Sequence, residues 1–466
     1  MNSAQQRGKY ILADWVAAIV TWLLFNWLRY EELAVYEGFS SLRNYLMYHQ
    51  VWKGQLLVPI FWLLLFALSG YYNKPFAKSR LTEFFSTLIT VTIGVVFLFF
   101  AIILNDLPRK YEVYYELFFI LWGIQFLSTY IPRLLITLDG IRRIKRREWS
   151  ARVLIMGVGR QAGRLADDLY KLGYTIVGFV EIEEEGEPAV ASDLIVGRFA
   201  EMAEMMPRLA VDELVLAPDS ADMHRQLSIL HALYSYGVPI KVLADNSNML
   251  SRVNIKTIHG EPLVDLTDNN FSEAEKNIKW LFDKVIAVVA LVVLSPAFLY
   301  VAWRIRRESE GPVFFRQERV GRFGKPFLIC KFRTMYLNAE EQGPLLSVEN
   351  DSRITPFGRI MRKYRIDELP QFWNVLKGEM SLVGPRPERP YYIHQIVKEA
   401  PYYYLLHNVR PGITSLGMVK YGYATNVEQM IERLKYDILY YENMSLVLDI
   451  TILIYTVKTV VTGKGV

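Results

Sequence analysis

Charged residues between positions 331 and 410 form the part of the sequence best suited to chemistry. Two adjacent carboxylates lie among several cations, and the full set is Lys331, Arg333, Arg362, Arg365, Asp367, Glu368, Arg386 with Pro387, and Arg410. Such cations neutralise a diphosphate, one carboxylate can attack phosphorus, and the other can hold Mg²⁺. The pattern therefore indicates phosphoryl transfer.

The adjacency of Asp367 and Glu368 restricts where they can work together. Neighbours on a regular helix point about 100° apart, so an adjacent pair converges most easily at a helix start. Pro370 is acceptable in a first turn, and a helix N-terminus favours phosphate. In the alternative interpretation, the pair only caps a helix and binds Arg365 on a solvated surface. Spacing alone leaves both interpretations open.

A series of motifs decides between them. Any one of the motifs is weak, but they occur in a fixed order: Ser295-Pro296, Gly311 to Gln317 with Arg319 and Gly321, Lys331 to Met335, Arg362 to Gln371, Ser381 to Pro387, Arg410 to Thr414, and Asp437 to Asn443. On these residues the chain from Lys279 to about Thr456 resembles the monotopic phosphoglycosyl transferases, the bacterial sugar transferases that start lipid-linked glycan assembly.

The resemblance implies a reaction and a role for each residue. Asp367 is similar to the family nucleophile, which forms an aspartyl-phosphosugar from a UDP-sugar while UMP leaves. The hexose 1-phosphate then passes to polyprenyl (undecaprenyl) phosphate, the first membrane step of exopolysaccharide, capsule or O-antigen assembly. Glu368, with Asp367, is implied in binding Mg²⁺. The implied substrate-binding residues are Arg362, Arg386, Pro387, Lys331, Arg333 and Arg410.

The sequence departs from the family pattern at Thr414-Ser-Leu-Gly417, where a Gly-Trp pair often follows the threonine. A sugar preference therefore cannot be inferred through this loop. Which UDP-sugar is used, and in which glycan pathway, stays open.

The elements that position these residues begin with a membrane unit. Hydrophobic residues make up 52% of the 466, too many for an ordinary soluble enzyme. Four apolar runs, at 10–28, 55–72, 81–104 and 113–136, approach the roughly 20 residues that cross about 30 Å of hydrocarbon. Polar faces at helical spacing, which a soluble bundle needs, are nearly missing from 56–68 and 88–104. We expect four spanning helices.

Lysine and arginine in the short loops predict the orientation. Basic residues precede the first run, crowd the loop between runs two and three, and form the dense stretch 142–147. The opposite side has fewer, spread over a longer loop, with Arg109 and Lys110 in the second one. The prediction is a multi-pass protein of the bacterial inner membrane with its active site on the cytoplasmic face. Beside a span, the stretch 142–147 indicates anionic lipid rather than nucleic acid.

From Arg152 the pattern changes to alternating strands and helices. Strands are expected at 152–156, 175–180, 194–197, 213–217 and 239–243, which favours a parallel, doubly wound sheet ending near Leu266. Gly157-Val-Gly159-Arg-Gln-Ala162 and Glu181 have the context of a dinucleotide site. No catalytic Tyr-x-x-x-Lys accompanies them, and large transferases carry a similar domain without a settled ligand. A structural or regulatory domain is favoured over an NAD site.

A second long apolar stretch, Val285–Trp303, is interrupted by Ser295-Pro296. Pro296 removes a helical hydrogen bond to the carbonyl of Val292, and both flanks are basic. A full crossing would export one basic flank, so we expect a re-entrant hairpin. The last apolar segment, 445–462, carries Asp449 and Lys458, which places it at the interface or in the domain core.

The expected architecture is a multi-domain membrane protein with a four-helix transmembrane unit (1–140), a basic linker (141–150), an α/β Rossmann-like domain (151–268) and a re-entrant-helix α+β catalytic domain (269–466, re-entrant helix 279–303). The single Cys330 and the 6 histidines exclude an internal disulfide and disfavour thiolate or histidine metal sites. A membrane-tethered scaffold is the alternative from another class, and an NAD-dependent sugar-modifying enzyme is a more distant one. Whether the chain forms a homo-oligomer stays open.

Overall fold

The protein was analysed as a computed structural model, which describes residues 3–31, 39–76, 78–102, 111–182, 188–217, 228–230, 232–243, 263–265, 269, 271–337, 339 and 351–462. It has two compact units: residues up to 150 together with 272–278, and residues 151–271 together with those from 279 onward. Each is taken by itself. Arg109, Lys110, Leu104, Leu266 and the predicted boundary at 268 lie outside the described residues.

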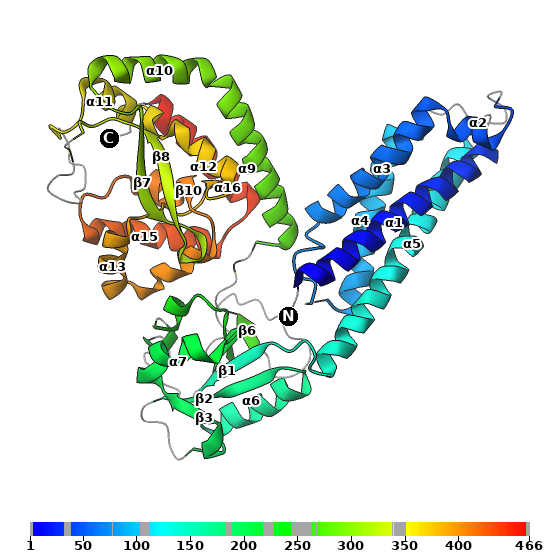
Figure 1. Cartoon of the computed structure of the whole chain (residues 1–466), viewed down its shortest axis with the longest axis horizontal. Helices are drawn as coiled ribbons and strands as arrows, with labels where there is room; N and C mark the ends of the chain where they lie inside the picture. The colour runs from blue at the N-terminus through cyan, green and yellow to red at the C-terminus, as the bar shows by residue number, and fades with distance from the viewer. Residues whose placement is uncertain are drawn as a thin grey trace. The chain divides into compact units, whose positions relative to one another are not determined.

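The first unit contains four long apolar helices, α1 (Ser3–Arg29), α3 (His49–Leu68), α4 (Arg80–Ala101) and α5 (Glu112–Lys145), with the short α2 (Leu42–Leu46) after α1 (Figure 1). All four are long and apolar enough to cross a membrane, as predicted. The helices differ from the apolar runs at several ends: α1 begins at Ser3, α3 spans His49–Leu68, α4 ends at Ala101, and α5 continues through the first half of the expected linker. Basic residues favour the negative end of a helix dipole, so the basic stretch extends α5 instead of ending it.

A buried charge cluster, which the sequence analysis missed, joins α1, α4 and α5. Arg133 donates two hydrogen bonds of 2.7 Å to the Asp14 carboxylate, and both side chains are fully buried. Arg133 also donates to Thr87 at 3.1 Å. Glu83 accepts from Thr137 at 2.9 Å and from Tyr71. Each buried charge thus has a charged or hydroxyl partner on another segment, as ionisable groups inside a membrane require.

Removing one member should leave the others uncompensated. We expect Arg133→Met to lower the free energy of unfolding in detergent by about 3–5 kcal/mol, because the Asp14 carboxylate stays buried without its partner. The double variant Asp14→Asn/Arg133→Met should recover much of the loss. Arg143→Met is the matched control, since Arg143 pairs with Asp139 on a partly exposed surface. An Arg133→Met protein as stable as this control would contradict the assignment.

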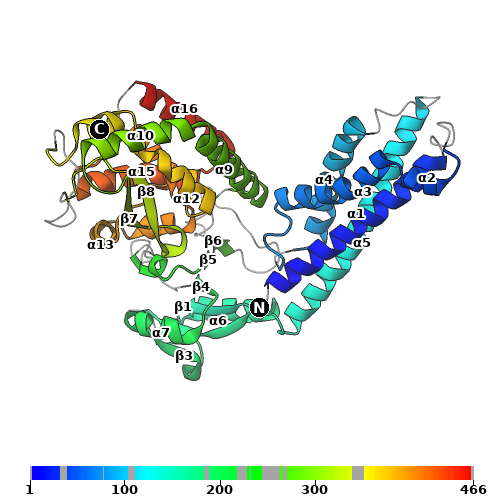
Figure 2. The same ribbon diagram turned by 45° about the horizontal axis from the view of Figure 1, so that its top comes forward.

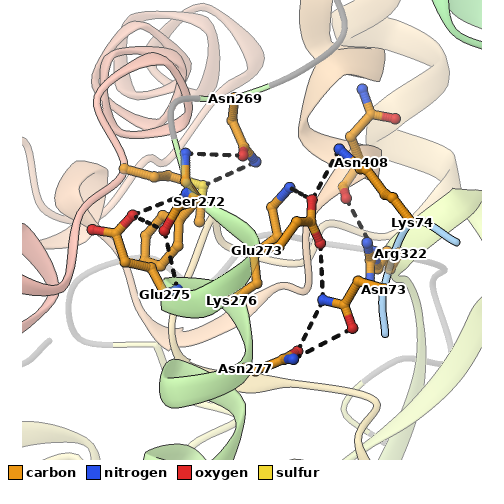
Figure 3. A network of polar contacts seen from close by, with 12 residues as sticks. Asn73, Lys74, Asn269, Ser272, Glu273, Glu275, Lys276, Asn277, Arg322 and Asn408 are labelled. Atoms are coloured by element: carbon orange, nitrogen blue, oxygen red, sulfur yellow. Dashed lines mark hydrogen bonds and ion pairs between the residues drawn. The ribbon is translucent and has the colours of Figure 1, made fainter. Parts of the chain in front are cut away.

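Helix α9 (Glu273–Val293) begins against the loop that follows α3. Glu273 accepts a hydrogen bond from Asn73 (2.9 Å) and pairs with Lys74 (2.9 Å) (Figure 3). Asn277 donates to the carbonyl of Ala67. Gly70 has a φ of +77°, and a Cβ there would lie 2.6 Å from the Glu273 carbonyl carbon. The first turn of α9 therefore lies at the same end of the four-helix unit as the basic loop 70–80.

The sheet of the second unit contains β1 (Arg152–Met156), β2 (Thr175–Glu181), β3 (Ile195–Arg198), β4 (Glu213–Leu216), β5 (Ile240–Leu243) and β6 (Leu263–Asp265) (Figure 2). The order is β3-β2-β1-β4-β5-β6, parallel except for β6. The five predicted strands are confirmed, and β6 was not predicted. Along β1, Val153 and Ile155 face α6 (Arg160–Lys171), whereas Leu154 and Met156 face α7 (Met202–Leu209). Alternation along a strand buried on both faces explains these two cores.

Helix α9 meets α10 (Ser295–Glu308) at a 61° bend at Leu294 (Figure 1). The break has a local chemical cause. Pro296 cannot donate to the carbonyl of Val292, and the Ser295 hydroxyl donates to that carbonyl instead, at 2.8 Å. The sequence therefore identified the position of the bend and its cause.

The remaining elements surround the hairpin of β7 (Phe314–Val320) and β8 (Pro326–Phe332). They are α11 (Pro356–Lys363), the 3₁₀ helix Ile366–Gln371, α12 (Phe372–Lys377), β9 (Ser381–Val383), α13 (Pro390–Glu399), the 3₁₀ helix Pro401–Asn408, β10 (Gly412–Thr414), α14 (Leu416–Lys420), α15 (Val427–Glu442) and α16 (Leu446–Val461). On α16, Asp449 is buried and accepts from Lys279 (2.6 Å) and Tyr440 (2.7 Å). Of the two expected places, the interface or the domain core, these contacts show that the Asp449 side of α16 packs against the domain core.

Candidate active site

A cavity of about 270 Å³ opens between the β7–β8 hairpin and the segments that follow β9 and α14. Its lining includes Lys331, Arg362, Asp367 and Arg386, which the sequence places far apart. Most of its polar groups are basic. The pocket therefore brings one predicted carboxylate together with four of the predicted cations, since Arg333 also lines it.

The chain turns sharply just before the two carboxylates. Arg365 adopts a left-handed conformation with φ 54°, and the 3₁₀ helix Ile366–Gln371 begins at the next residue. The turn directs both carboxylates into the domain: Asp367 is 8% exposed and Glu368 5%. The predicted regular helix start is thus a 3₁₀ helix after a left-handed residue. The alternative of a solvated capping pair is wrong.

Cations surround Glu368. Lys331 donates to one oxygen at 2.8 Å, and Arg365 reaches the other at 3.3 Å. The Arg386 guanidinium lies 3.7 Å away. Although burial alone would raise the pKa of Glu368, Lys331, Arg386 and Arg365 outweigh it and hold that pKa below its ordinary value. Glu368 therefore stays ionised and fixes the cations around the pocket.

Asp367 is in the opposite situation. Burial raises its pKa to about 6, and the charge of Glu368 adds to the increase, while Lys331, Arg362 and Arg365 oppose it. In the part of the chain that the structure describes, no group donates a hydrogen bond to its carboxylate. A carboxylate near cations but without a donor is a reactive anion, and two adjacent carboxylates with separated pKa values are typical of catalytic sites.

Comparisons with known proteins identify the family of the chain. A family model described as "Bacterial sugar transferase" matches residues 274–463, and one described as "CoA-binding domain" matches 67–244. The UDP-glucose:undecaprenyl-phosphate glucose-1-phosphate transferase of Xanthomonas campestris is 31% identical over 335 residues, 67% of each chain. The chain belongs to the bacterial sugar transferase family. The resemblance noted from its motifs is confirmed.

Two other relatives match over different lengths. The UDP-N-acetylgalactosamine-undecaprenyl-phosphate N-acetylgalactosaminephosphotransferase of Aeromonas hydrophila is 41% identical over 229 residues, 49% of this chain and 53% of that protein. This chain therefore spans about half the length of that relative. The Escherichia coli UDP-glucose:undecaprenyl-phosphate glucose-1-phosphate transferase is 27% identical over 414 residues, 86% of this chain and 88% of that one.

Within this family member, the predicted site residues separate into two groups. Arg362 and Arg386 line the pocket; Arg362 is held by Thr334 (2.9 Å), and Arg386 approaches the sulfur of Met418 (3.2 Å). Arg333 also lines it, but its guanidinium binds the carbonyls of Ser309 and Glu310 at the end of α10. In this structure Arg333 therefore fixes the end of the β7–β8 hairpin to the end of α10.

Arg410 and Pro387 are not among the residues that line the pocket. Arg410 donates to the carbonyl of Gly378 at 3.1 Å, and the Pro387 carbonyl accepts from Arg319 at 3.1 Å. In this structure both residues have contacts within the protein, and their role as direct substrate contacts stays a prediction. Ser295 and Pro296 lie at the α9–α10 bend, where the sequence put them as the helix break.

Several pocket residues received no role from the sequence: Arg319, Glu388, Tyr392, Tyr423 and Arg433. Arg319 lies in a recognised motif, but the motif gave no indication of what it contacts. Tyr423 lies 5.6 Å from the guanidinium groups of both Arg365 and Arg386. No local pattern distinguishes these residues, because α15 and the loop before it reach the pocket only through the tertiary fold.

The carboxylate pair also bears on Mg²⁺. Among the described residues, no group of three or more His, Cys, Asp or Glu side chains could hold a metal. Magnesium is commonly bound by one or two carboxylates together with substrate phosphates and water. Asp367 and Glu368 are oxygen donors of that kind, so the pair fits an ion that arrives with a diphosphate.

The glycine turn after β1 has only part of the geometry expected of a dinucleotide site. Gly157 has a φ of +122°, and Gly159 is the N-cap of α6, as in a nucleotide-binding turn. Glu181, the expected ribose-binding acid, pairs with Arg198 at 3.1 Å. Its carboxylate is therefore already engaged.

Proposed function

We propose that this protein transfers a hexose 1-phosphate from a UDP-sugar to undecaprenyl phosphate and releases UMP, as an early membrane step of exopolysaccharide, capsule or O-antigen assembly. The observation that carries the proposal is the buried Asp367 carboxylate at the pocket wall, with Lys331, Arg362, Arg365 and Arg386 around it and its neighbour. The printed names of the relatives supply the substrate classes. An inert scaffold would have no use for a nucleophile placed among cations.

The proposed reaction has two steps at one phosphorus atom. A carboxylate oxygen of Asp367 attacks the β-phosphorus of the UDP-sugar, and the bond to the bridging oxygen breaks so that UMP leaves with the electron pair. The product is an aspartyl-phosphosugar. An oxygen of undecaprenyl phosphate then attacks the same phosphorus, and Asp367 departs as a carboxylate. Splitting one displacement into two is the usual advantage of covalent catalysis.

The other residues act on charge and position. Arg362 and Arg386 neutralise the diphosphate, and Glu368 holds Lys331 within 2.8 Å so that its ammonium stays beside Asp367. When bound, Mg²⁺ would be held by Asp367 and Glu368 and would help to neutralise the departing phosphate. A general-base role for Asp367 would add little, because a phosphate is already largely ionised near pH 7, its second pKa being about 6.

The nucleophile can be tested with donor substrate alone. We expect mass spectrometry of enzyme mixed with a reactive UDP-sugar to show a phosphosugar on the peptide that contains Asp367. Asp367→Asn keeps the shape but removes the anion, so both the adduct and UMP release should disappear. Glu432→Gln, which removes an exposed carboxylate paired with Lys435, is the matched control.

Kinetics give a second view of the same step. Parallel initial-rate plots for the two substrates should accompany the adduct, as ping-pong chemistry requires. Intersecting plots without any adduct would exclude the covalent route, although UMP release dependent on undecaprenyl phosphate would still support the transferase. No UMP release from any UDP-sugar, with or without the lipid, would refute the function itself.

The raised pKa of Asp367 predicts a pH dependence. UMP release in the first half-reaction should increase as pH rises through about 6 and level off above it, because only the ionised carboxylate attacks. Glu368→Gln removes a negative charge that raises this pKa, so the acid limb should move to lower pH even as the rate falls. Stopped-flow measurement of UMP release as a function of pH would show this shift. An acid limb at the same pH in Glu368→Gln would contradict the effect of the Glu368 charge on the pKa of Asp367.

The membrane arrangement is part of the proposal. Arg7, Lys9, the loop 70–80 and the end of α5 carry most of the basic residues near the spans, which supports an inner-membrane protein with these segments in the cytoplasm. Helix α9 starts at the end of the four-helix unit that carries the basic loop 70–80, and α10 leaves it at an angle of 61°. In the proposed arrangement α9 and α10 form a re-entrant hairpin that keeps the catalytic domain cytoplasmic. We propose a structural or regulatory role for the sheet domain.

Cysteine labelling tests this arrangement. In a Cys330→Ser background, a cysteine in place of Thr462 should react with a membrane-impermeant maleimide only after permeabilisation. A cysteine in place of the exposed Met47 should react in intact cells. Replacing Ser295 and Pro296 together with leucine should straighten the hairpin and raise outside labelling at position 462. Labelling of that position from outside in the otherwise unchanged chain would exclude the re-entrant topology.

A further inference from the structure

The pocket does not end at the carboxylate pair. Beyond Arg386 it continues to a polar end whose lining includes Gln317, Arg319, Glu388, Tyr392 and Arg433. These residues come from β7, the segment after β9, α13 and α15. None of them has a part in the phosphoryl chemistry described above, so the polar end requires its own explanation.

Arg319 is the least satisfied group in this region. One terminal nitrogen donates to Gln317 (2.7 Å), the other donates to the Pro387 carbonyl (3.1 Å) and lies 3.7 Å from the Glu388 carboxylate. Its Nε is shielded from solvent and has no hydrogen-bond partner among the described residues. Burial lowers the pKa of Arg319 to about 10, although Glu388 opposes the shift. A buried donor left unpaired is costly, so Arg319 would gain a hydrogen bond if its side chain shifted to meet a ligand acceptor in the cavity.

Glu388 supplies the opposite kind of group. Its side chain is buried, and one oxygen accepts a 2.6 Å hydrogen bond from Arg433. The other oxygen is the one 3.7 Å from Arg319, outside hydrogen-bond distance. The polar end thus offers an acceptor and donors at neighbouring positions. Hydroxyl groups, which both donate and accept, match such a surface.

Carbohydrate fits this end better than the other parts of the two substrates. A prenyl chain has no polar groups to pair with Arg319 or Glu388. A uracil ring could stack on Tyr392, but the α-phosphate and the ribose separate it from the β-phosphorus, whereas the hexose is bonded to that phosphorus through one oxygen. Position agrees with this assignment. Glu388 follows Arg386 by two residues, Arg386 lies 3.7 Å from Glu368, and the polar end belongs to the same cavity as Asp367, which attacks the phosphorus in the proposed reaction. In the proposed reaction the sugar remains on that phosphorus after UMP has left.

We propose that Arg319 and Glu388, together with Gln317, form the subsite that recognises the hydroxyl or acetamido groups of the transferred hexose. This assignment rests on the proposed transferase function. The subsite holds the sugar in both half-reactions, and Arg319 and Glu388 select among sugar epimers by leaving a buried donor or acceptor unpaired when a hydroxyl points the wrong way. The loop Thr414–Gly417 is not among the residues that line this cavity.

The test separates the sugar from the nucleotide. UDP-glucose, UDP-galactose, UDP-N-acetylglucosamine and UDP-N-acetylgalactosamine are compared as donors for the wild type, Arg319→Lys and Glu388→Gln, with UMP as a sugar-free inhibitor. For the preferred donor we expect kcat/KM to fall by about tenfold or more, as for a lost hydrogen bond to a charged group. The ratio between epimers should shrink, while the inhibition constant of UMP stays within about twofold. Arg316→Lys, on the exposed face of the same strand, is the matched control.

Three results would overturn the assignment. A parallel increase in the inhibition constant of UMP would place the uridine at this end. An equal fall for all four donors, with the epimer ratio unchanged, would reduce Arg319 and Glu388 to a structural role. Should both variants fail to fold, Gln317→Ala must change the epimer ratio, or the proposal is wrong. A wild type without UMP release from any donor would instead refute the transferase function on which the subsite rests.

Discussion

Two adjacent carboxylates cannot both remain ionised in a buried pocket unless cations are held around them, and this requirement organises the catalytic region. Lys331 comes from β8, Arg362 from α11, Arg365 from the turn after α11, and Arg386 from the segment after β9. Of these four segments, only α11 and the turn after it are consecutive in sequence. Each segment must therefore be fixed independently for the charges to meet.

Helices α9 and α10 fix most of these segments. Asp283 of α9 accepts from the Ser381 hydroxyl (2.6 Å) and from the backbone of Leu382, which holds β9 and thereby Arg386. At the end of α10, Glu308 accepts from the backbone N–H of Phe357 (2.8 Å), at the start of the helix that carries Arg362. Arg333 binds the carbonyls of Ser309 and Glu310 and fixes the end of β8 to α10. The bent helix pair is thus a scaffold for the active site, in addition to the re-entrant anchor proposed for it.

Features that depend on residues close together in the sequence could be predicted, whereas features that depend on distant contacts could not. The apolar runs, the strands of the sheet and the break at Ser295-Pro296 depend on nearby residues, and the structure reproduces them within a few positions. Asp367 and Glu368 could be identified because motif order added information that spacing lacked. Local patterns could not reveal the left-handed Arg365, since a non-glycine residue with positive φ is imposed by its surroundings.

Contacts between distant segments could not be predicted either, because local patterns carry no information about them. Asp14 and Arg133 lie 119 positions apart, and each, taken singly, is an isolated charge in an apolar run. Arg410 has the residue type and motif of a phosphate ligand, yet its guanidinium binds the Gly378 carbonyl. A recognised motif establishes that a residue is required by the fold or the site. Only its contacts distinguish the two.

The charge of the pocket gives a physical reason for two substrates to use one site in turn. Four cations face the Asp367 and Glu368 carboxylates, which leaves a surplus of two positive charges for the diphosphate of a UDP-sugar. In the proposed reaction UMP carries away two negative charges, and the aspartyl-phosphosugar keeps one in place of the Asp367 carboxylate. The surplus after the first step is again two, which matches the ionised phosphate of the lipid. The same cations can therefore attract the donor, release UMP and attract the acceptor without any rearrangement of protein charge.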